Sequence, residues 1–265
     1  MRRNPDMHAI IDSLLTQLAF PLNVFACASL LQEGQVDYLH YGLFDAGHPD
    51  IRSAQRRSTE LILARLPACG ARILEIGIGI GTTASLLGAR GYRLIGISPD
   101  PAQVAIARDR VGDAARLEAV RFEDYSADAE TLDLILLQES FQYLDPEYFF
   151  AEARRLLVPG GQILILDQCR LRSTSPSESA LHLIDDVLAQ AGCEGFLLSE
   201  RLDLTQEATP TLDYILTILD AHRESLLAEL PITAADLDQL REAVAANRRR
   251  YHQGVLGYIL YRFTR

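Results

Sequence analysis

The stretch ILEIGIGIGTTASLL, residues 73–87, joins a short apolar run to a helix-like run through a glycine-rich turn. One acid and three glycines alternate in it, at Glu75, Gly77, Gly79 and Gly81. Glycine has no Cβ, so the backbone of such a turn can approach a ligand closely. A dinucleotide fingerprint needs a third glycine where this chain has Thr82. The spacing therefore predicts a ligand-binding strand–turn–helix and disfavours a nicotinamide site.

The acid at the end of the first expected strand indicates the charge of that ligand. A pyrophosphate seeks the N-terminus of a helix and repels carboxylates. Glu75 instead suits a ligand with a cationic amino end. S-adenosylmethionine carries both an ammonium and a sulfonium group. The alternative to a ligand-binding role is that the glycine turn only allows the strand to pack on the helix.

Composition and charge limit the classes of protein and partner. The chain has 265 residues, 48% of them apolar and 23% charged, so it can bury a sizeable core. A net charge of −11 without a basic block disfavours a nucleic-acid partner. The most apolar window, residues 19–31, is too short to span a bilayer. We expect a cytoplasmic protein without a membrane span.

Four cysteines are scattered along the chain, at Cys27, Cys69, Cys169 and Cys193. None of them forms a CxxC pair or stands at metal-ligand spacing from a histidine. We expect reduced, mostly buried thiols and no metal site.

Short apolar runs alternate with helical stretches from Arg72 onward. The expected strands cover residues 72–76, 93–97, 120–122, 132–137, 162–166, 196–202 and 257–263. The expected helices among them lie near residues 82–90, 101–111 and 146–157. Asp145 and Pro146 supply an N-cap and a first-turn proline for the last of these. Apolar strands separated by helices predict an α/β fold with a parallel sheet covered on both faces.

Helical segments flank this core. Periodicity over residues 6–33, broken at Pro21, predicts helices in the N-terminal part, and a further helix is expected over 51–66. Two apolar stripes of helical spacing also precede the last strand. A hairpin connection to that strand would need only a few residues, so the extra residues are expected to form helices. Thr233 and Asp236 form a capping arrangement for the second of these helices.

These segments predict four parts in the chain. The expected parts are an N-terminal helical cap over 1–50, a core over 51–204, a helical lid insert over 205–254 and the last strand of the core over 255–265.

Further motifs follow the glycine turn in an order typical of one enzyme family. The turn resembles the first motif of the class I S-adenosylmethionine-dependent methyltransferases. GISPDPAQVAIAR, residues 96–108, is similar to their second-strand motif, and FEDYS, residues 122–126, resembles the segment before their fourth strand. LDLILLQESFQYL, residues 132–144, and RRLLVPGGQILIL, residues 154–166, resemble the fourth strand and the turn into the fifth. The resemblance implies a seven-stranded Rossmann-like sheet and S-adenosylmethionine as cofactor.

The resemblance also implies which residues hold the cofactor. Asp124 matches the acid that grips the adenine amino group, whereas the usual ribose-binding acid after strand two is replaced by Ser98. Asp100 lies two residues further on, and it either contacts the ribose or only caps the helix that Pro101 begins. The expected cofactor-binding residues are Tyr38, Glu75, Gly77, Gly79, Gly81, Ser98, Asp100, Gln103, Asp124, Tyr125 and Gln138.

A narrower resemblance is to the branch that holds cyclopropane-fatty-acid synthases, tocopherol-type methyltransferases and natural-product tailoring enzymes. It is carried by Ala54 and Gln55, the helix start with Gln103, the Asp124–Tyr125 pair and the tail YHQGVLGYIL, residues 251–260. In that branch a helical cap and a long insert enclose a lipophilic acceptor. Cyclopropane synthases carry Glu-His in place of Gln142 and Tyr143 and a cysteine in place of His40, so the resemblance argues against cyclopropanation.

Methyl transfer from a sulfonium is an in-line displacement, so the enzyme mainly aligns the acceptor and excludes water. A base is needed only if the acceptor loses a proton. His40, in the aromatic loop DYLHYGLFD, is the first choice because its usual pKa lies near neutrality; the alternative is a structural histidine. Glu139 leaves the carboxyl end of a strand, where ligands bind in open α/β sheets. The expected catalytic residues are His40, Glu139 and Tyr143, and the candidate list also includes Tyr38, Tyr41, His182 and Tyr214.

The sequence thus predicts a methyltransferase for a small, lipophilic or natural-product acceptor, directed to oxygen, nitrogen or carbon. The alternative is a catalytically silent protein of the same fold that binds a partner. The intact glycine turn and Asp124 argue against that alternative, since a silent protein needs no donor pocket. A homodimer is compatible with the sequence.

Overall fold

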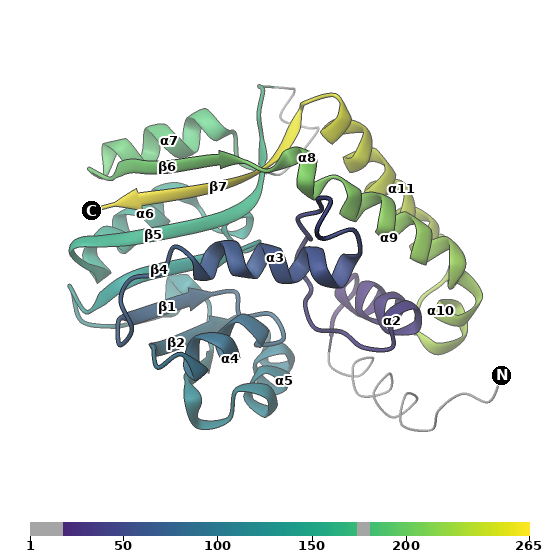
Figure 1. The fold of residues 1–265 in the computed structure, drawn as a ribbon, viewed down its shortest axis with the longest axis horizontal. Helices are drawn as coiled ribbons and strands as arrows, with labels where there is room; N and C mark the ends of the chain where they lie inside the picture. The colour runs from purple at the N-terminus through teal and green to yellow at the C-terminus, as the bar shows by residue number, and fades with distance from the viewer. Residues whose placement is uncertain (1–17, 174–180) are drawn as a thin grey trace.

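The computed structural model describes residues 18–173 and 181–265. Seven strands form one sheet in the order β3-β2-β1-β4-β5-β7-β6 (Figure 1). They are β1 (Arg72–Ile76), β2 (Arg93–Ser98), β3 (Arg116–Ala119), β4 (Leu132–Gln138), β5 (Leu157–Arg170), β6 (Leu197–Asp203) and β7 (Leu256–Thr264). The first five run parallel, and β7 pairs antiparallel with β5 and β6. The predicted α/β fold with a seven-stranded Rossmann-like sheet is confirmed.

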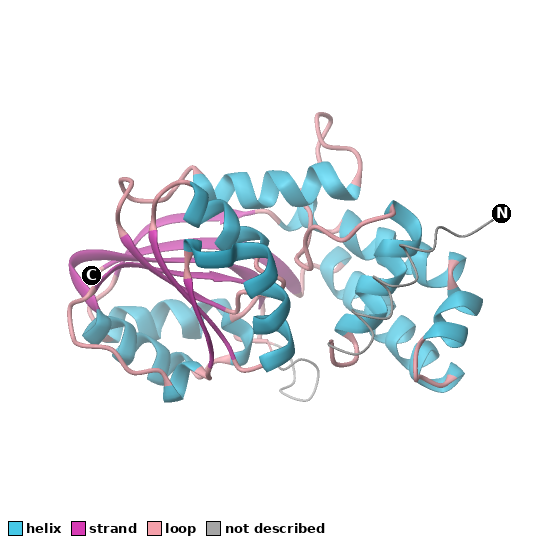
Figure 2. Ribbon diagram, turned by 90° about the horizontal axis from the view of Figure 1, so that it is seen from below, coloured by secondary structure: helices cyan, strands magenta, loops and turns pink. Residues whose placement is uncertain are grey.

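Five helices cover the two faces of this sheet (Figure 2). They are α3 (Ile51–Leu63), α4 (Thr82–Ala89) and α5 (Pro101–Val111) on one face, and α6 (Pro146–Leu156) and α7 (Ile184–Cys193) on the other. Successive side chains of a strand point to opposite faces. In β4, accordingly, Leu134 and Leu136 pack in the cluster of the first face, while Ile135 and Leu137 pack in that of the second.

The third strand lies earlier than the sequence predicts. A strand over residues 120–122 is wrong, because β3 ends at Ala119 and Phe122 begins the 3-10 helix η2 (Phe122–Asp124). β3 is an edge strand in which only Leu117 is buried, so it has no apolar run to reveal it. The apolar Phe122 packs from η2 against Phe149 of α6, with ring centroids 5.6 Å apart.

A second group of helices lies beside the end of the sheet toward which β1 points (Figure 1). It comprises α2 (Leu22–Glu33), α8 (Thr205–Ala208), α9 (Pro210–Ala221), α10 (Arg223–Glu229) and α11 (Ala234–His252). α9 packs against both α2 and α11. The predicted capping box of Thr233 and Asp236 starts α11, and Asp145 caps α6 as predicted. The expected periodicity before Leu18 lies outside the described residues.

Polar side chains join the insert to α2. Tyr214 of α9 donates a hydrogen bond to Glu33 Oε1 over 3.0 Å, and the His222 ring contacts Gln32 Oε1 at the same distance. Between them, Leu212, Leu219 and Leu237 are buried in the common core. The apolar stripe of α9 is therefore buried against α2 as well as against α11.

The cysteines differ from the expectation of mostly buried thiols. Cys27 and Cys169 are buried, whereas Cys69 and Cys193 are exposed, and all four are free. In the described part of the chain, no helix is both long and apolar enough to cross a membrane.

Candidate functional site

The glycine turn joins β1 to α4. In the sheet, β1 has β2 on one side and β4 on the other, so the turn lies where the strand order reverses. Gly77, Gly79 and Gly81 all have positive φ, at 82°, 51° and 81°. A Cβ on Gly77 would lie 2.4 Å from the Ser140 Cβ, and one on Gly81 would lie 2.8 Å from the Ala107 backbone. These two glycines are required by packing. A Cβ on Gly79 would meet no atom of the described residues within 4 Å, so this residue borders open space in that part of the chain.

The Glu75 carboxyl lies just before this turn and is only 3% exposed. Its Oε2 atom is buried and has no hydrogen-bond partner among the described residues. Burial without a counter-charge raises the pKa of Glu75 to about 8. A buried polar atom without a partner is costly, and native structures seldom retain one without a reason. A ligand with a cationic group would supply the missing partner.

The end of β2 holds the expected ribose-binding position. Ser98 is buried, and its hydroxyl donates to Gln103 Oε1 over 3.4 Å. The Asp100 side chain accepts from the Ala102 backbone N–H at 2.8 Å and caps α5, with Pro101 as the first helical residue. The geometry thus favours the capping role for Asp100, and its role toward a ribose stays a prediction.

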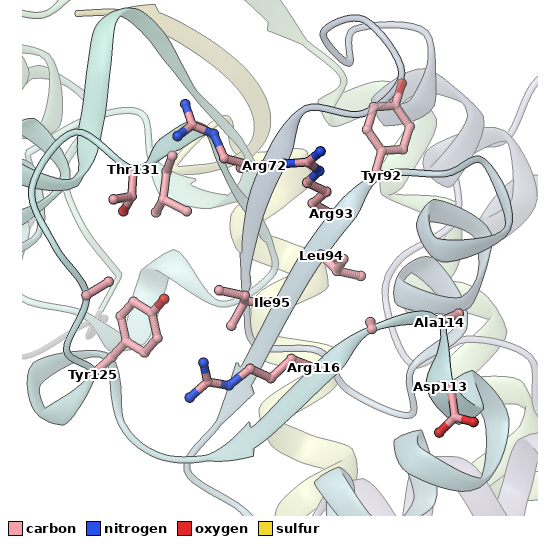
Figure 3. Close-up of a pocket in the computed structure, with 13 residues that line it drawn as sticks. Arg72, Tyr92, Arg93, Leu94, Ile95, Asp113, Ala114, Arg116, Tyr125 and Thr131 are labelled. Carbon is pink, nitrogen blue, oxygen red and sulfur yellow. The ribbon is translucent and has the colours of Figure 1, made fainter.

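Asp124 and Tyr125 differ in exposure although they are adjacent. Asp124 ends η2 with an exposed side chain that is free to meet a ligand. Tyr125 is buried, and its ring points into a pocket of about 330 Å³ (Figure 3). Arg72, Arg93 and Arg116 line this pocket from the first residues of three strands.

The pocket therefore opens at the amino ends of β1, β2 and β3, whereas the glycine turn follows the carboxyl end of β1. It is separate from the turn. Arg72 is paired with Asp133 at 2.9 Å and Arg116 with Glu118 at 2.8 Å, so two of its three guanidinium groups are already neutralised.

Gln138 lies at the carboxyl end of β4 and bridges two helices beside the turn. Its amide nitrogen donates to Ser58 Oγ of α3, and its amide oxygen accepts from Thr83 Oγ1 of α4, both over 3.3 Å. The amide thus holds α3 and α4 together at the expected cofactor site.

His40 has both ring nitrogens hydrogen-bonded. The Tyr41 carbonyl is 2.9 Å from Nδ1 and can only accept, so Nδ1 carries the proton. Nε2 then accepts from the Thr59 hydroxyl over 3.1 Å. Burial lowers the pKa of the ring to about 4, which leaves it neutral at pH 7. The Tyr38 ring lies beside it, with ring centroids 4.8 Å apart. This geometry favours the structural role that the sequence left open.

Glu139 has the most unusual environment among the expected catalytic residues. It follows β4 with φ +58°, a conformation that non-glycine residues rarely adopt. Its Oε1 atom accepts from the Tyr41 backbone N–H at 2.6 Å and from the Tyr258 hydroxyl at 2.7 Å. Burial raises the pKa of Glu139 to about 8. Strained backbone of this kind often marks a functional residue.

The other candidates lie in less suitable positions. Tyr143 is 78% exposed at the end of the 3-10 helix η3 (Phe141–Tyr143). His182 is half-buried, and its Nε2 lies 3.3 Å from the Phe141 carbonyl. Tyr214 joins α9 to α2, as described above. Among residues 18–173 and 181–265, no group of His, Cys, Asp and Glu is arranged to hold a metal ion.

Comparison with known proteins identifies the fold family. The methyltransferase domain family matches residues 74–165. An uncharacterized methyltransferase of Mycobacterium bovis is 26% identical over 122 residues, which cover 46% of this chain and 47% of its own. The chain thus spans about half the length of the curated relatives that it matches.

Solved structures resemble the chain over nearly its whole length. The cyclopropane synthase MmaA2 from Mycobacterium tuberculosis has a TM-score of 0.79 at 17% identity, covering 96% of this chain and 98% of its own. A geranyl diphosphate C-methyltransferase from Streptomyces coelicolor, crystallised with S-adenosyl-L-homocysteine, has a TM-score of 0.70 at 18% identity, covering 100% and 99%. The chain therefore contains a methyltransferase domain over residues 74–165 and has the fold of the class I S-adenosylmethionine-dependent methyltransferases. The cofactor of this methyltransferase family is S-adenosylmethionine.

Two features of the glycine turn fit that cofactor. The unpaired Glu75 Oε2 offers a partner for the cofactor's ammonium group, and the open space at Gly79 lets the backbone approach it. Contacts among residues 18–173 and 181–265 explain neither feature.

Sequence reasoning missed part of the polar cluster around Glu139. Asp167 of β5 is 1% exposed and accepts from the Gln142 backbone N–H at 3.1 Å, and burial raises its pKa to about 7. Tyr258 of β7 stacks on Tyr41 with ring centroids 5.7 Å apart. The acid near the end of the QILILD run was a usable signal for Asp167. Nothing local marked Tyr258, because the sheet order brings β7 beside β5.

Proposed function

We propose that this protein is a methyltransferase that transfers the methyl group of S-adenosylmethionine to a small, lipophilic or natural-product acceptor. The observation that carries the proposal is the buried, unpaired Glu75 carboxyl beside the open glycine turn. Both lie at the switch point of the sheet, where ligands bind in open α/β folds. The cofactor, when bound, supplies an activated methyl group. Glu75 would hold its amino end, Gly79 its nearest backbone contact and Asp124 its adenine.

The acceptor side is built from aromatic and aliphatic groups around one carboxyl. The Tyr41 and Tyr258 rings stack, and Tyr251 of α11 lies beside Tyr41 with ring centroids 6.5 Å apart. Leu212 of the insert and Tyr258 belong to the same apolar cluster. One structural neighbour methylates geranyl diphosphate, which supports an acceptor with an apolar part. Rings with a polar edge suit such a molecule when it also carries one reactive polar group.

Glu139 is the proton acceptor in this proposal. Two donors hold its Oε1 atom, whereas Oε2 forms no hydrogen bond with any described residue and is left for the acceptor. A base works best when its pKa lies near the working pH, and the pKa of about 8 meets that condition. The acceptor's proton would pass to Oε2 as its oxygen, nitrogen or carbon gains the methyl group. His40 would serve as base only if its bond to Thr59 broke.

The test is transfer of a labelled methyl group from S-adenosylmethionine to a panel of apolar molecules with a hydroxyl, an amine or an enol. We expect the wild type to label at least one class, and Glu139→Gln to label it at least a hundredfold more slowly. Labelling of none, by a protein that binds the donor, would favour the catalytically silent alternative. If Glu139→Gln labels the acceptor at the wild-type rate, Glu139 is not the base, and alignment of donor and acceptor alone explains the catalysis.

A further inference from the structure

The loop that carries Tyr38 is bound to the fold on both sides of that residue. On the C-terminal side, Gln55 of α3 donates to the His40 carbonyl over 2.7 Å, and the Tyr41 backbone donates to Glu139. The Gly42 backbone donates to the Thr211 hydroxyl of α9 over 3.0 Å. This side is therefore fixed to α3, to the end of β4 and to the insert.

On the N-terminal side, the loop is bound through its main-chain carbonyls to α4 and α5. The Thr82 hydroxyl donates to the Asp37 carbonyl, and Arg110 Nη1 donates to the Thr82 hydroxyl. Arg110 also donates to the Asp37 carbonyl over 3.2 Å and to the Val36 carbonyl over 3.3 Å. Arg52 of α3 adds a longer ion pair to the Asp37 carboxylate, at 3.4 Å.

Thr82 is the first residue of α4 and directly follows Gly81, the last glycine of the turn. It occupies the position at which a dinucleotide-binding turn has its third glycine. Its hydroxyl thus bonds the loop to the end of the cofactor turn. The main chain just before Tyr38 is thereby bonded to the residue that follows the turn, and it cannot move away from the turn while these bonds hold.

We propose that Arg110 and Thr82 are positioning residues that latch the Tyr38 loop over the glycine turn and set the rate at which the methyl donor is exchanged. The proposal rests on the proposed function, because it needs a donor in the turn. The latch consists of the Thr82 hydroxyl, the Arg110 guanidinium and the carbonyls of Val36 and Asp37. A donor enters or leaves only after these bonds open. The hydrogen-bond acceptors of the latch are main-chain carbonyls. The latch therefore depends on the side chains of Thr82 and Arg110 and not on the side chain of Val36.

A chase experiment measures the exchange rate directly. Labelled S-adenosylmethionine is bound to the full chain, an excess of unlabelled compound is added, and the loss of label is followed. Hydrogen bonds to charged groups are strong enough that Arg110→Ala should speed dissociation about tenfold or more. Thr82→Val, which keeps the shape and removes the hydroxyl, should do the same. Thr82→Ser should stay near the wild-type rate, and Arg110→Lys should fall between.

Arg108 supplies the matched control. It lies on the same helix and also donates to a carbonyl, but to that of Leu117 in β3, over 2.9 Å. Arg108→Ala should leave the dissociation rate within twofold of the wild type. If Arg110→Ala and Thr82→Val also stay within twofold, the latch is overturned.

Amide hydrogen exchange of the donor-free protein separates this proposal from the proposed function. Arg110→Ala should speed exchange over residues 35–39 and leave residues 41–43 unchanged, since the latter are held by other groups. Unchanged exchange over 35–39 would overturn the latch whether or not a donor binds. If the wild type retains no labelled donor, the proposed function fails while this exchange result still decides the latch.

Discussion

Glu75 combines two properties that can be changed by one substitution. Its carboxyl is buried with an unpaired oxygen, which costs stability in the free protein and would hold the cofactor's cation in the complex. Glu75→Gln should therefore stabilise the free protein by about 1–3 kcal/mol at pH 8.5. The same substitution should weaken S-adenosylmethionine binding at least tenfold. Chemical denaturation measures the unfolding free energy, and calorimetry measures donor affinity. A variant that is less stable than the wild type, or that binds the donor as tightly, would contradict the assignment.

Glu139 and His40 are distinguished by their pH dependence. A base must be deprotonated, so activity that uses Glu139 should rise with pH through about 8, where its pKa lies. Activity that uses His40 would instead rise through about 4 and be flat at neutral pH. We expect the first profile in kcat/KM, with Glu139→Gln losing at least a hundredfold and His40→Ala much less. A flat profile from pH 6 to 9 would argue for an acceptor that needs no base.

Site residues that lie close together in the sequence could be predicted. Contacts between residues that only the fold brings together could not. Glu75 and the glycine turn lie within seven residues, so their spacing alone indicated a ligand site. The contacts that require Gly77 and Gly81 come from Ser140 and Ala107, far along the chain, and no local pattern shows them. Asp100 was left between two roles because a helix cap and a ribose ligand use the same residue type at the same position.

At the level of elements, the central strands were located well and the edge strand was not. β1, β2 and β4 are covered on both faces, so they are apolar runs that a reader can recognise. β3 borders solvent, and its RLEA sequence has one buried residue. The insert was recognised because a connection to the last strand needs only a few residues. That its helices pack on α2 could not be predicted, since nothing in either sequence specifies the partner.

Thr211 tests how the insert acts on the site. Its hydroxyl, on α9, accepts from the Gly42 backbone and is buried. Thr211→Val leaves that N–H without a partner and should destabilise the fold by about 1–3 kcal/mol. It should lower turnover more than donor affinity, because Gly42 adjoins Tyr41 on the acceptor side. The control is Thr217→Val, whose exposed hydroxyl only bonds within the same helix. Equal effects of the two variants on turnover would exclude this role of the insert.

At the scale of the whole molecule, two kinds of carboxyl have opposite effects on how stability depends on pH. Burial raises the pKa of Glu75, Glu139 and Asp167, so the stability they contribute is present below the usual carboxyl pKa and is lost as pH rises to about 8. Ion pairs with arginine lower the pKa of Asp133 and Glu200, so their contribution is present at neutral pH and is lost in acid. Stability of the free protein should therefore be highest in mildly acidic solution.

This balance predicts a measurable slope. Between about pH 6 and 8.5 the unfolding free energy of the donor-free protein should fall, and Glu75→Gln should reduce the fall. Denaturant titrations at a series of pH values measure it. A free energy that stays constant or rises over that range would show that the three carboxyls are not buried uncharged.

The central claim is that the glycine turn binds S-adenosylmethionine, and calorimetric titration of the full chain tests it most directly. We expect S-adenosylmethionine and S-adenosylhomocysteine to bind at one site per chain and NAD not to bind. A side chain on Gly79 would fill the open space and strain a residue with φ +51°, so Gly79→Val should abolish the binding. Binding of NAD, or unchanged S-adenosylmethionine affinity in Gly79→Val, would contradict the account.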